Sequence, residues 1–386
     1  MNYKISYDTW GKEELKAINE VIKTGKYSMG DYVKRFEKIF SKIIGKKYSV
    51  MTNSGSSANL IGVGSQFFIN KNRLKRGDEV IVPAIGWSTT YSPLNQYGLN
   101  IKILDVDLNN FNINIDLIEK AISKKTKMIC VVNVLGIPCD LNRIQKICNK
   151  YKLILYVDNC ESLGSYLGKK QAGSFGDFST HSFFFSHHIS TIEGGMVSTN
   201  NKEIYNILKS LRAHGWTRDL DKKNLIHKYM KNDFNSEYKF VLPGYNLRPS
   251  EINGSIGIQQ IKKLKKMVRT RRQNLKIFEN YFLNDDRFLT TKTPYYSSCF
   301  AFPLILKDNS SNQRNYFFKK MKKNNIEYRL IAGGNLLNQP FIKYFNKRIY
   351  KKLKNAYKIH NDGFMIGNSS LDLSKNIKYL YETLKN

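Results

Sequence analysis

The sequence predicts an α/β fold with a central, mostly parallel sheet and a smaller C-terminal α+β domain. Short, nearly continuous apolar runs alternate with helix-like segments through the first two-thirds of the chain, as expected for parallel strands that are buried on both faces. At 386 residues the chain exceeds the size at which one hydrophobic core usually suffices. We therefore predict a large domain over residues 1–245 and a small domain over residues 246–386.

Two helices are expected before the sheet begins. Apolar residues between Phe36 and Ile44 recur at helical spacing, and Gly45 is suited to end that helix. A second helix is expected to begin within Asn53 to Leu60, where small polar residues leave backbone N–H groups free for an anion. The expected strands are Glu79–Pro83, Ile101–Val106, Met128–Val132, Leu153–Val157, His181–Phe185 and Gly195–Ser198.

The pattern changes beyond residue 245. Pro249 precedes a long, basic helical stretch that runs from Ser250 to about Leu283. The apolar run Phe300–Leu306 is typical of a strand and opens the small domain. The polar stretch Lys307–Arg314 is predicted to be a surface loop.

Composition restricts the classes of function. The formal net charge of +32 allows a nucleic acid, an acidic membrane surface or a polyanionic small substrate as partner. The lysines are scattered and no nucleic-acid-binding motif accompanies them, so we expect neither a nucleic acid nor a membrane. The chain shows no secretory signal and no bilayer-length apolar run, which predicts a cytoplasmic protein. Its five cysteines lack a Cys-x-x-Cys pair and are expected to be reduced.

Polar residues that follow the predicted strands form a candidate site. Asp158 directly follows a buried strand, at the edge where α/β sheets bind ligands. Trp87 follows another strand and can cover the face of a flat ligand. Gly55, Ser56 and Ser57 fall at a predicted helix N-terminus, which suits a phosphate. Taken singly, these residues are equally explained as a helix cap, a core tryptophan and a turn.

The segment Ser182 to Gly195 reads Ser-Phe-Phe-Phe-Ser-His-His-Ile-Ser-Thr-Ile-Glu-Gly-Gly. Together with motifs in the same order along nearly the whole chain, it resembles the DegT/DnrJ/EryC1/StrS family of nucleotide-sugar aminotransferases. The resemblance implies the aspartate-aminotransferase-like fold type I and pyridoxal 5'-phosphate as cofactor. That family has a lysine where this chain has His187 and an asparagine where it has His188. An imidazole forms no stable Schiff base but is a good base near neutral pH, which favours elimination over amino transfer.

The resemblance also implies a role for each site residue. Asp158 would keep the pyridine nitrogen protonated, Trp87 would stack on the ring, and Glu161, where relatives often have glutamine, would contact the ring hydroxyl. Asn246 would reach the phosphate of a neighbouring subunit, which implies a homodimer with shared active sites. His188 is expected to be structural support. The phosphate would be bound by Gly55, Ser56, Ser57 and Ser182, and the nucleotide sugar by Arg329, Asn335 and the segment of Arg212, His214 and Gly215.

These roles imply a dehydratase that removes the 3-hydroxyl of a nucleotide-linked 4-keto-6-deoxyhexose, with GDP-4-keto-6-deoxymannose as the favoured substrate. His187 would be the base, and L-glutamate would convert the cofactor to pyridoxamine 5'-phosphate. The product would serve deoxysugar synthesis, such as colitose for lipopolysaccharide O-antigen or capsule.

Three alternatives remain open. The first is an ordinary nucleotide-sugar aminotransferase, which would need a lysine that the sequence does not supply at the required place. The second is a reductase-coupled CDP-sugar 3-dehydrase, whose iron–sulfur cluster needs clustered cysteines that this chain lacks, so no metal is expected. The third is a catalytically silent protein that binds sugar nucleotides.

Overall fold

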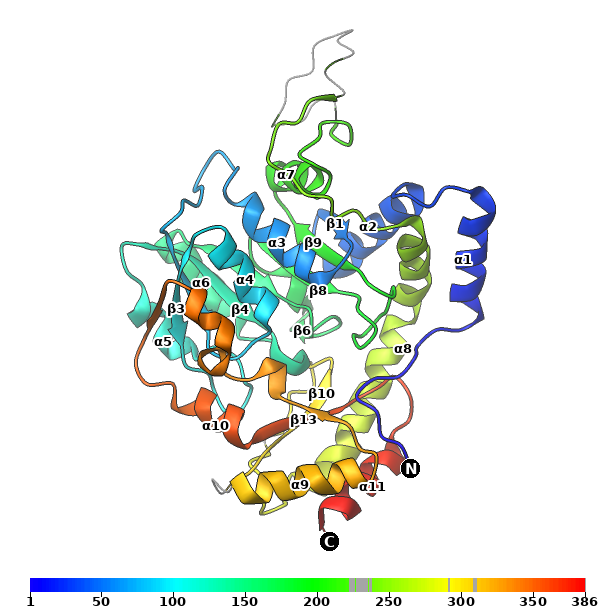
Figure 1. Cartoon of the computed structure of the whole chain (residues 1–386), viewed down its shortest axis with the longest axis vertical. Helices are drawn as coiled ribbons and strands as arrows, with labels where there is room; N and C mark the ends of the chain where they lie inside the picture. Colours follow the sequence, from blue (N-terminus) through cyan, green and yellow to red (C-terminus); the bar gives the residue numbers. More distant parts are fainter. Residues whose placement is uncertain (222–225, 227–234, 236–237, 291, 308–310, 386) are drawn as a thin grey trace.

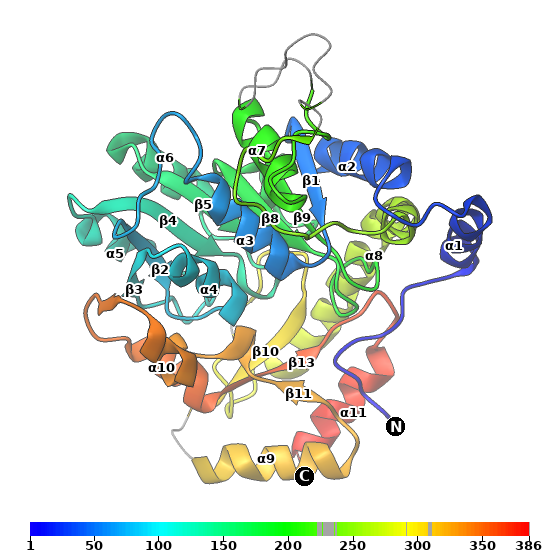
Figure 2. The same ribbon diagram turned by 45° about the horizontal axis from the view of Figure 1, so that its top comes forward.

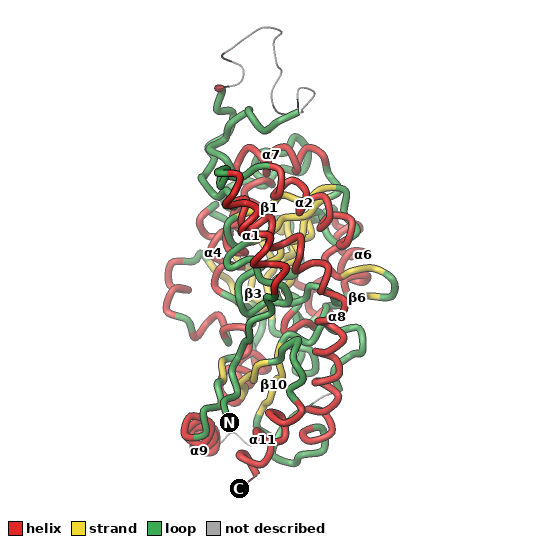
Figure 3. Tube along the Cα trace, turned by 90° about the vertical axis from the view of Figure 1, so that its right-hand side faces the viewer, coloured by secondary structure: helices red, strands yellow, loops and turns green. Residues whose placement is uncertain are grey.

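The computed structural model describes residues 1–221, 226, 235, 238–290, 292–307 and 311–385. The molecule is elongated, with a large α/β part at one end and a smaller part at the other (Figures 1 and 3). Both chain termini lie at the smaller end, where the Asn376 side-chain amide donates a hydrogen bond to the Asn2 carbonyl at 3.3 Å.

The large part is built on an eight-stranded sheet in the order β1-β9-β8-β5-β4-β2-β3-β12. Among the described strands of this sheet, only β9 runs in the direction opposite to the others, so the predicted mostly parallel sheet is confirmed. The strands are β1 (Tyr48–Thr52), β2 (Glu79–Pro83), β3 (Asn100–Leu104), β4 (Thr126–Val132), β5 (Ile154–Asp158), β8 (Phe178–Ser182), β9 (Gly195–Thr199) and β12 (Lys347–Ile349).

Helices cover both faces of this sheet, because successive side chains of each strand point to opposite faces. Val80 and Val82 pack in one core with α3 (Gly55–Ser65), α4 (Ser88–Gln96), α7 (Lys202–Arg212) and α10 (Lys354–Asp362). Ile81 packs in the opposite core with α5 (Ile115–Ala121) and α6 (Leu141–Tyr151). In Figure 2, α3 and α4 lie in front of the strands. Each buried strand therefore has two apolar faces, as its nearly continuous apolar run predicts.

The smaller part contains a second, antiparallel sheet of β10 (Ala301–Ile305), β13 (Gly363–Gly367) and β11 (Tyr328–Arg329). Helices α9 (Ser311–Lys323) and α11 (Ser374–Lys385) complete it. The long helix α8 (Glu251–Phe282) joins the two parts. Its first half packs through Ile258 and Ile261 against α2 (Asp31–Ile44), and its second half packs through Phe278 in the core of the small sheet.

The remaining elements are short or peripheral. Helix α1 (Lys12–Thr24) packs against α8 at the edge of the molecule (Figure 1). Strands β6 (Tyr166–Leu167) and β7 (Lys170–Gln171) form a small hairpin, and single 3-10 turns are η1 (Val134–Gly136), η2 (Ala172–Ser174), η4 (Ile331–Gly333), η5 (Leu336–Asn338) and η6 (Pro340–Tyr344). None of the helices in the described part of the chain is long and apolar enough to cross a membrane.

Two segments cross the predicted domain division at residue 245, which stays a prediction. Tyr3 pairs with Ile326 and is buried in the core of the small sheet. Strand β12, from the C-terminal part of the sequence, joins the large sheet beside β3. Each part therefore contains a short segment from the other end of the sequence, and α8 is the main connection between the two parts.

The structure corrects two predicted segments. The strand expected over His181–Phe185 is β8, which ends at Ser182; the chain then leaves the sheet and exposes Phe184 and Phe185. The loop expected over Lys307–Arg314 is helical from Ser311 onward, and residues 308–310 lie outside the described residues. The three consecutive phenylalanines have the composition of a buried strand, but of these only Phe183 is buried. All five cysteines are free, as expected.

Candidate active site

A cavity of about 640 Å³ opens at the carboxyl edge of the large sheet. One wall comes from the large part, and the opposite wall comes from residues 329–341 and Met365 of the small part. No lysine is among the described residues that line it. The cavity brings together most of the predicted site residues, namely Gly55, Ser56, Trp87, Asp158, Glu161, Ser182, His187 and Arg329.

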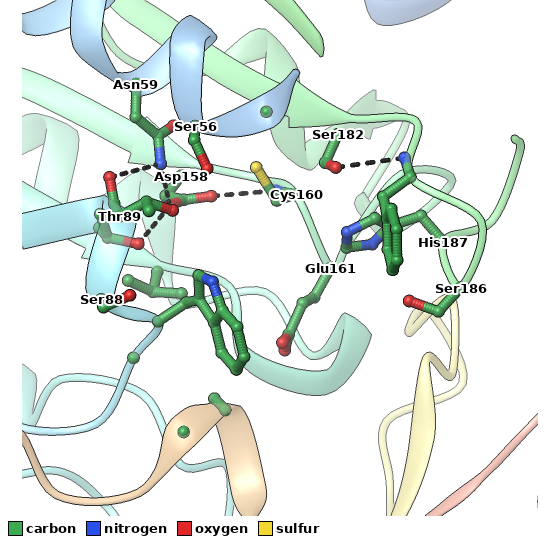
Figure 4. Close-up of a pocket in the computed structure, with 18 of the residues that line it drawn as sticks. Ser56, Asn59, Ser88, Thr89, Asp158, Cys160, Glu161, Ser182, Ser186 and His187 are labelled. Atoms are coloured by element: carbon green, nitrogen blue, oxygen red, sulfur yellow. Dashed lines mark hydrogen bonds between the residues drawn. The ribbon is translucent and has the colours of Figure 1, made fainter. Parts of the chain in front are cut away.

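Asp158 ends β5 and is 4% exposed, so its carboxylate is held by protein groups. Oδ2 accepts hydrogen bonds from the Thr90 hydroxyl at 2.6 Å and the Asn59 side-chain amide at 3.3 Å. Oδ1 accepts one from the Cys160 backbone N–H at 3.1 Å (Figure 4). Because donors approach both oxygens, the carboxylate is fixed in one orientation at the cavity wall.

The N-terminus of α3 meets the end of β8 at the same wall. A Cβ atom on Gly55 would lie 2.6 Å from Cβ of Ser182, so only glycine allows this approach. A Cβ atom on Gly195 would likewise lie 2.1 Å from the Ser54 carbonyl, which explains the second glycine of the Glu-Gly-Gly sequence. Gly55, Ser56 and the Ser182 hydroxyl form a small polar cradle at a helix N-terminus, a site that favours an anion.

Ser57 differs from its neighbours in the predicted phosphate site. It does not line the cavity, and its hydroxyl donates to Asn53 Oδ1 at 2.6 Å. Its backbone N–H donates to the Ser54 hydroxyl, which caps α3. The side chain of Ser57 therefore stabilises the start of the helix, and a phosphate contact from its hydroxyl is not favoured.

Trp87 lies at the cap of α4 and lines the cavity with its side chain 55% exposed. A tryptophan is usually largely buried, and its exposure here leaves one ring face free for a ligand. Gly333 lies opposite, where an added Cβ would be 3.4 Å from the Trp87 ring. The structure therefore excludes the core-tryptophan interpretation of this residue.

His187 lies in the loop after β8 and its imidazole points into the cavity (Figure 4). Its ring packs against Phe300 at a centroid distance of 5.2 Å. Nδ1 is buried and has no hydrogen-bond partner among the described residues. Burial, with a smaller effect of the positive charge on Arg271, lowers the pKa of His187 to about 4. The imidazole is therefore neutral at physiological pH, in the form that can accept a proton.

Glu161 lies on the same side of the cavity. Its Oε2 accepts a hydrogen bond from the Leu135 backbone N–H at 2.7 Å. Burial raises the pKa of the Glu161 carboxyl to about 7; the Leu135 N–H opposes this and the charge of Asp158 adds to it. Glu161 can therefore hold or release a proton near neutral pH, whereas an ordinary carboxylate cannot.

Besides Ser57, three predicted residues are not brought to this cavity. Asn246 is exposed, and its side-chain oxygen accepts a hydrogen bond from Arg248 Nε at 3.1 Å. His214 is exposed with a positive φ of 61°. Asn335 is fully buried, and its side-chain oxygen caps η5 by accepting from the Leu337 N–H. The roles of Asn246 and His214 stay predictions, and the capping bond of Asn335 does not favour a substrate contact.

Arg212, from the same predicted segment as His214, also lies outside the cavity lining. Its Nη1 forms a buried ion pair with Glu37 at 2.6 Å and donates to the Met51 carbonyl. His188 is buried beside His187, and its Nε2 lies 3.2 Å from the Ser298 carbonyl oxygen, which supports its expected structural role.

Sequence reasoning missed several residues that shape the site. Asn59 lies one helical turn after Gly55, and Thr90 lies one turn after Trp87, so helical spacing gives a signal for both. The Phe300 ring packs against His187 from a segment more than 100 positions away in sequence, and no local pattern predicts this contact.

The fold and the cavity together define a fold type I transferase of the kind that uses pyridoxal phosphate. The chain belongs to the DegT/DnrJ/EryC1/StrS aminotransferase family, whose model matches residues 8–384.

The chain is similar to several dehydratases along nearly its whole length. The chain is 45% identical to the GDP-4-keto-6-deoxy-D-mannose 3-dehydratase of Yersinia pseudotuberculosis, over all of this chain and 98% of that protein. The same dehydratase from Escherichia coli, solved with bound hydrated PLP, superposes with a TM-score of 0.96 at 43% identity, covering 100% of this chain and 99% of that one. A structure of GDP-4-keto-6-deoxymannose-3-dehydratase with a trapped PLP-glutamate geminal diamine gives 0.95 at 43% identity, covering 99% and 100%.

Proposed function

We propose that this chain is a pyridoxal-phosphate-dependent 3-dehydratase of a nucleotide-linked 4-keto-6-deoxyhexose, with GDP-4-keto-6-deoxymannose as its substrate. One observation carries the proposal: His187 projects into a cavity that no lysine lines, among the residues described. An aminotransferase of this fold needs a lysine at that place for its Schiff base. Unlike that lysine, a neutral imidazole forms no Schiff base, but it can still accept and return a proton, which suits elimination.

The residues present fit pyridoxal phosphate. The α3 N-terminus and Ser182 offer donors for the phosphate, and Asp158 offers an oriented carboxylate for the pyridine nitrogen. The exposed ring of Trp87 offers a flat surface for the cofactor ring. The unpaired Nδ1 of His187 leaves a polar atom without a partner at the same cavity. Each part of the cofactor therefore has a chemically matched group.

In its amine form the cofactor supplies an amino group for the sugar's C4 ketone and a ring that accepts electrons. His187 takes up a proton on an imidazole nitrogen and can return it to the departing 3-hydroxyl. Glu161, protonated up to about pH 7, can donate a hydrogen bond at the side of the cavity it lines. Arg329 lies at the opposite wall, where its guanidinium suits the diphosphate of a nucleotide sugar.

Glutamate is the proposed amino donor. Over one full cycle, glutamate and the hydroxylated keto sugar become 2-oxoglutarate, ammonia and the 3-deoxy keto sugar, so that atoms and electrons balance. The capture of a PLP-glutamate adduct in a protein 43% identical to this chain supports this choice. Supply of a deoxysugar such as colitose for O-antigen or capsule, in the cytoplasm, is part of the same proposal.

A homodimer is also part of the proposal. Asn246 is exposed and lies outside the cavity of its own chain. An asparagine that binds the cofactor phosphate from this position would have to serve the site of a second copy. Sedimentation of the protein tests the homodimer. A cofactor-binding assay that compares the natural protein with Asn246→Ala tests the contact to the phosphate.

The direct test is the mass of the product. The protein is incubated with pyridoxal phosphate, glutamate and GDP-4-keto-6-deoxymannose, and the nucleotide sugar is analysed by mass spectrometry beside an ammonia assay. A keto sugar lacking one oxygen, with an equal amount of ammonia, is the expected result. A product that carries an amino group would overturn the proposal in favour of transamination. Unchanged sugar in the presence of bound cofactor would overturn the choice of substrate.

A further inference from the structure

A buried positive charge lies behind the proposed base. Arg271, in the middle of α8, is 3% exposed. Its Nη1 donates hydrogen bonds to the carbonyls of Phe300 at 3.0 Å and Asn368 at 2.9 Å, and its Nε is buried without a partner. No described carboxylate forms an ion pair with it. Buried guanidinium groups are normally paired with an acid, so this uncompensated charge calls for an explanation.

The first link from Arg271 to the base is mechanical. Phe300 is held from both sides of its backbone, because its N–H donates to the Leu135 carbonyl at 3.0 Å and its carbonyl accepts from Arg271. The Phe300 ring then packs against the rings of His187 at 5.2 Å and His188 at 5.8 Å. A shift of the Phe300 backbone would therefore move the surface on which the His187 imidazole rests.

The second link is electrostatic. The charge on Arg271 lowers the pKa of His187 and that of His188, in both cases after the larger effect of burial. A cation close to an imidazole disfavours the imidazolium form. Other charged or titratable groups also lie around the cavity and Arg271. They are Asp158 at the end of β5, Cys160 and Glu161 after it, His188 and Glu193 in the loop of His187, Cys299, Arg329 on β11, and Arg272 on α8.

We propose that Arg271 is a positioning residue for His187: its hydrogen bond to the Phe300 carbonyl fixes the Phe300 ring against the imidazole, and its buried charge adds to the positive potential at that imidazole. A base whose ring is free to turn reaches the substrate less often, and a nearby cation disfavours the imidazolium form. The role of His187 as base rests on the proposed function. The effect of Arg271 on the ring does not, because it is a property of the protein without substrate.

The neighbouring residue Arg272 provides a matched control. It also lies on α8 and also binds the segment that leads to Phe300. Its Nε donates to the Ser297 carbonyl at 2.7 Å and its Nη2 to the Tyr296 carbonyl at 3.3 Å. Arg272 therefore binds the chain three residues before Phe300. Its charge does not contribute to the low pKa of His187.

The test is a titration of the histidine rings by NMR in ring-labelled protein, with His187 assigned through His187→Gln among the six histidines. Arg271→Gln removes the charge, its shorter amide does not replace the two hydrogen bonds of Nη1, and it is expected to raise the pKa of His187 by about one pH unit. Arg271→Lys, which keeps a charge, and Arg272→Gln are expected to leave that pKa near its natural value. A folded Arg271→Gln protein with an unchanged His187 titration would overturn the proposal.

Phe300→Leu tests the mechanical link without removing a buried charge, and it applies even if Arg271→Gln does not fold. We expect about a tenfold loss in kcat with little change in KM for the nucleotide sugar, because the base is misplaced and the substrate contacts remain. An unchanged kcat would overturn the positioning role. If the natural protein forms no deoxygenated sugar but the Arg271→Gln titration still shifts, the proposed function fails and the effect of Arg271 on His187 stands.

Discussion

Within the large part the cavity has two sides, a first wall around Asp158 and a second wall around His187, and they treat their polar groups in opposite ways. On the first wall, Asp158 accepts hydrogen bonds from Thr90, Asn59 and the Cys160 N–H, so both its oxygens are engaged. On the second wall, His187 has a buried Nδ1 with no partner among the described residues, and its ring is held by the apolar surface of Phe300. Both groups are products of the same fold, because Asp158 ends β5 and His187 lies in the loop after the neighbouring strand β8.

Under the proposed function, the difference separates a group that must stay still from one that must react. A carboxylate held by three donors keeps its orientation, which suits the permanent partner of a cofactor ring. An imidazole without a hydrogen-bond partner can change its protonation state without breaking a bond to the protein. The two walls therefore predict different responses to substitution.

The largest effect is expected at the base. His187→Gln should reduce kcat by about a thousandfold, because general-base catalysis by a positioned side chain is lost. Binding of pyridoxal phosphate, measured by absorbance after dialysis, should remain within about tenfold, since Asp158, Trp87 and the N-terminus of α3 are unchanged. His188→Gln is the control and should cost much less. Equal losses in the two variants would show that the loop, and not the imidazole of His187, matters.

The next effect is expected at the fixed carboxylate. Asp158→Asn keeps the shape but removes the charge that would hold a pyridine nitrogen protonated, and kcat should fall by about a hundredfold. Asp105→Asn is a matched control, because Asp105 also follows a strand and binds the backbone N–H groups of Asn355 and Ala356 away from the cavity. Turnover per folded molecule should be unchanged in that control. A small loss in Asp158→Asn would contradict the role of the first wall.

A smaller effect is expected from a partner of Asp158. Thr90→Val removes the 2.6 Å hydrogen bond to a buried carboxylate at almost constant volume. The free energy of unfolding, measured with urea in the absence of cofactor, should fall by about 2 kcal/mol. Ser92→Ala removes a hydroxyl from the same helix that bonds only the Ser88 carbonyl, and should change stability by less than about 0.5 kcal/mol. Equal changes would show that Asp158 is not held as described.

The subtlest effect is a change in pH dependence. Burial raises the pKa of Glu161 to about 7, so this carboxyl is neutral below that pH and ionised above it. If the neutral form is required, kcat/KM of the natural protein falls as pH rises through about 7. Glu161→Gln stays neutral, so its kcat/KM should remain level across that range. A fall at the same pH in both proteins would assign the titration to another group.

The sequence predicts the first wall better than the second. Asp158 ends a run of buried strand residues, and the approach of α3 to β8 is marked by glycines and serines in local motifs. Even the partners Asn59 and Thr90 follow predicted residues by one helical turn. These features are local in the chain, so periodicity and turn chemistry are enough to find them.

The surroundings of the base depend on contacts between distant segments. His187 is visible in its motif, but Phe300 reaches it from the position before β10, and Arg271 holds Phe300 from helix α8. An arginine in a basic helix looks like a solvated residue, and only the packing shows that it is buried. The edge strand β12 was missed for a similar reason, because its three residues are exposed and carry no apolar pattern.

The most direct measurement is a single turnover with the protein loaded with pyridoxamine 5'-phosphate and no glutamate. The natural protein should convert about one equivalent of GDP-4-keto-6-deoxymannose per site to the 3-deoxy keto sugar and release one ammonia. His187→Gln, equally loaded, should convert almost none in the same time. Conversion by His187→Gln at the natural rate, or an amino sugar from either protein, would contradict a dehydratase whose base is His187.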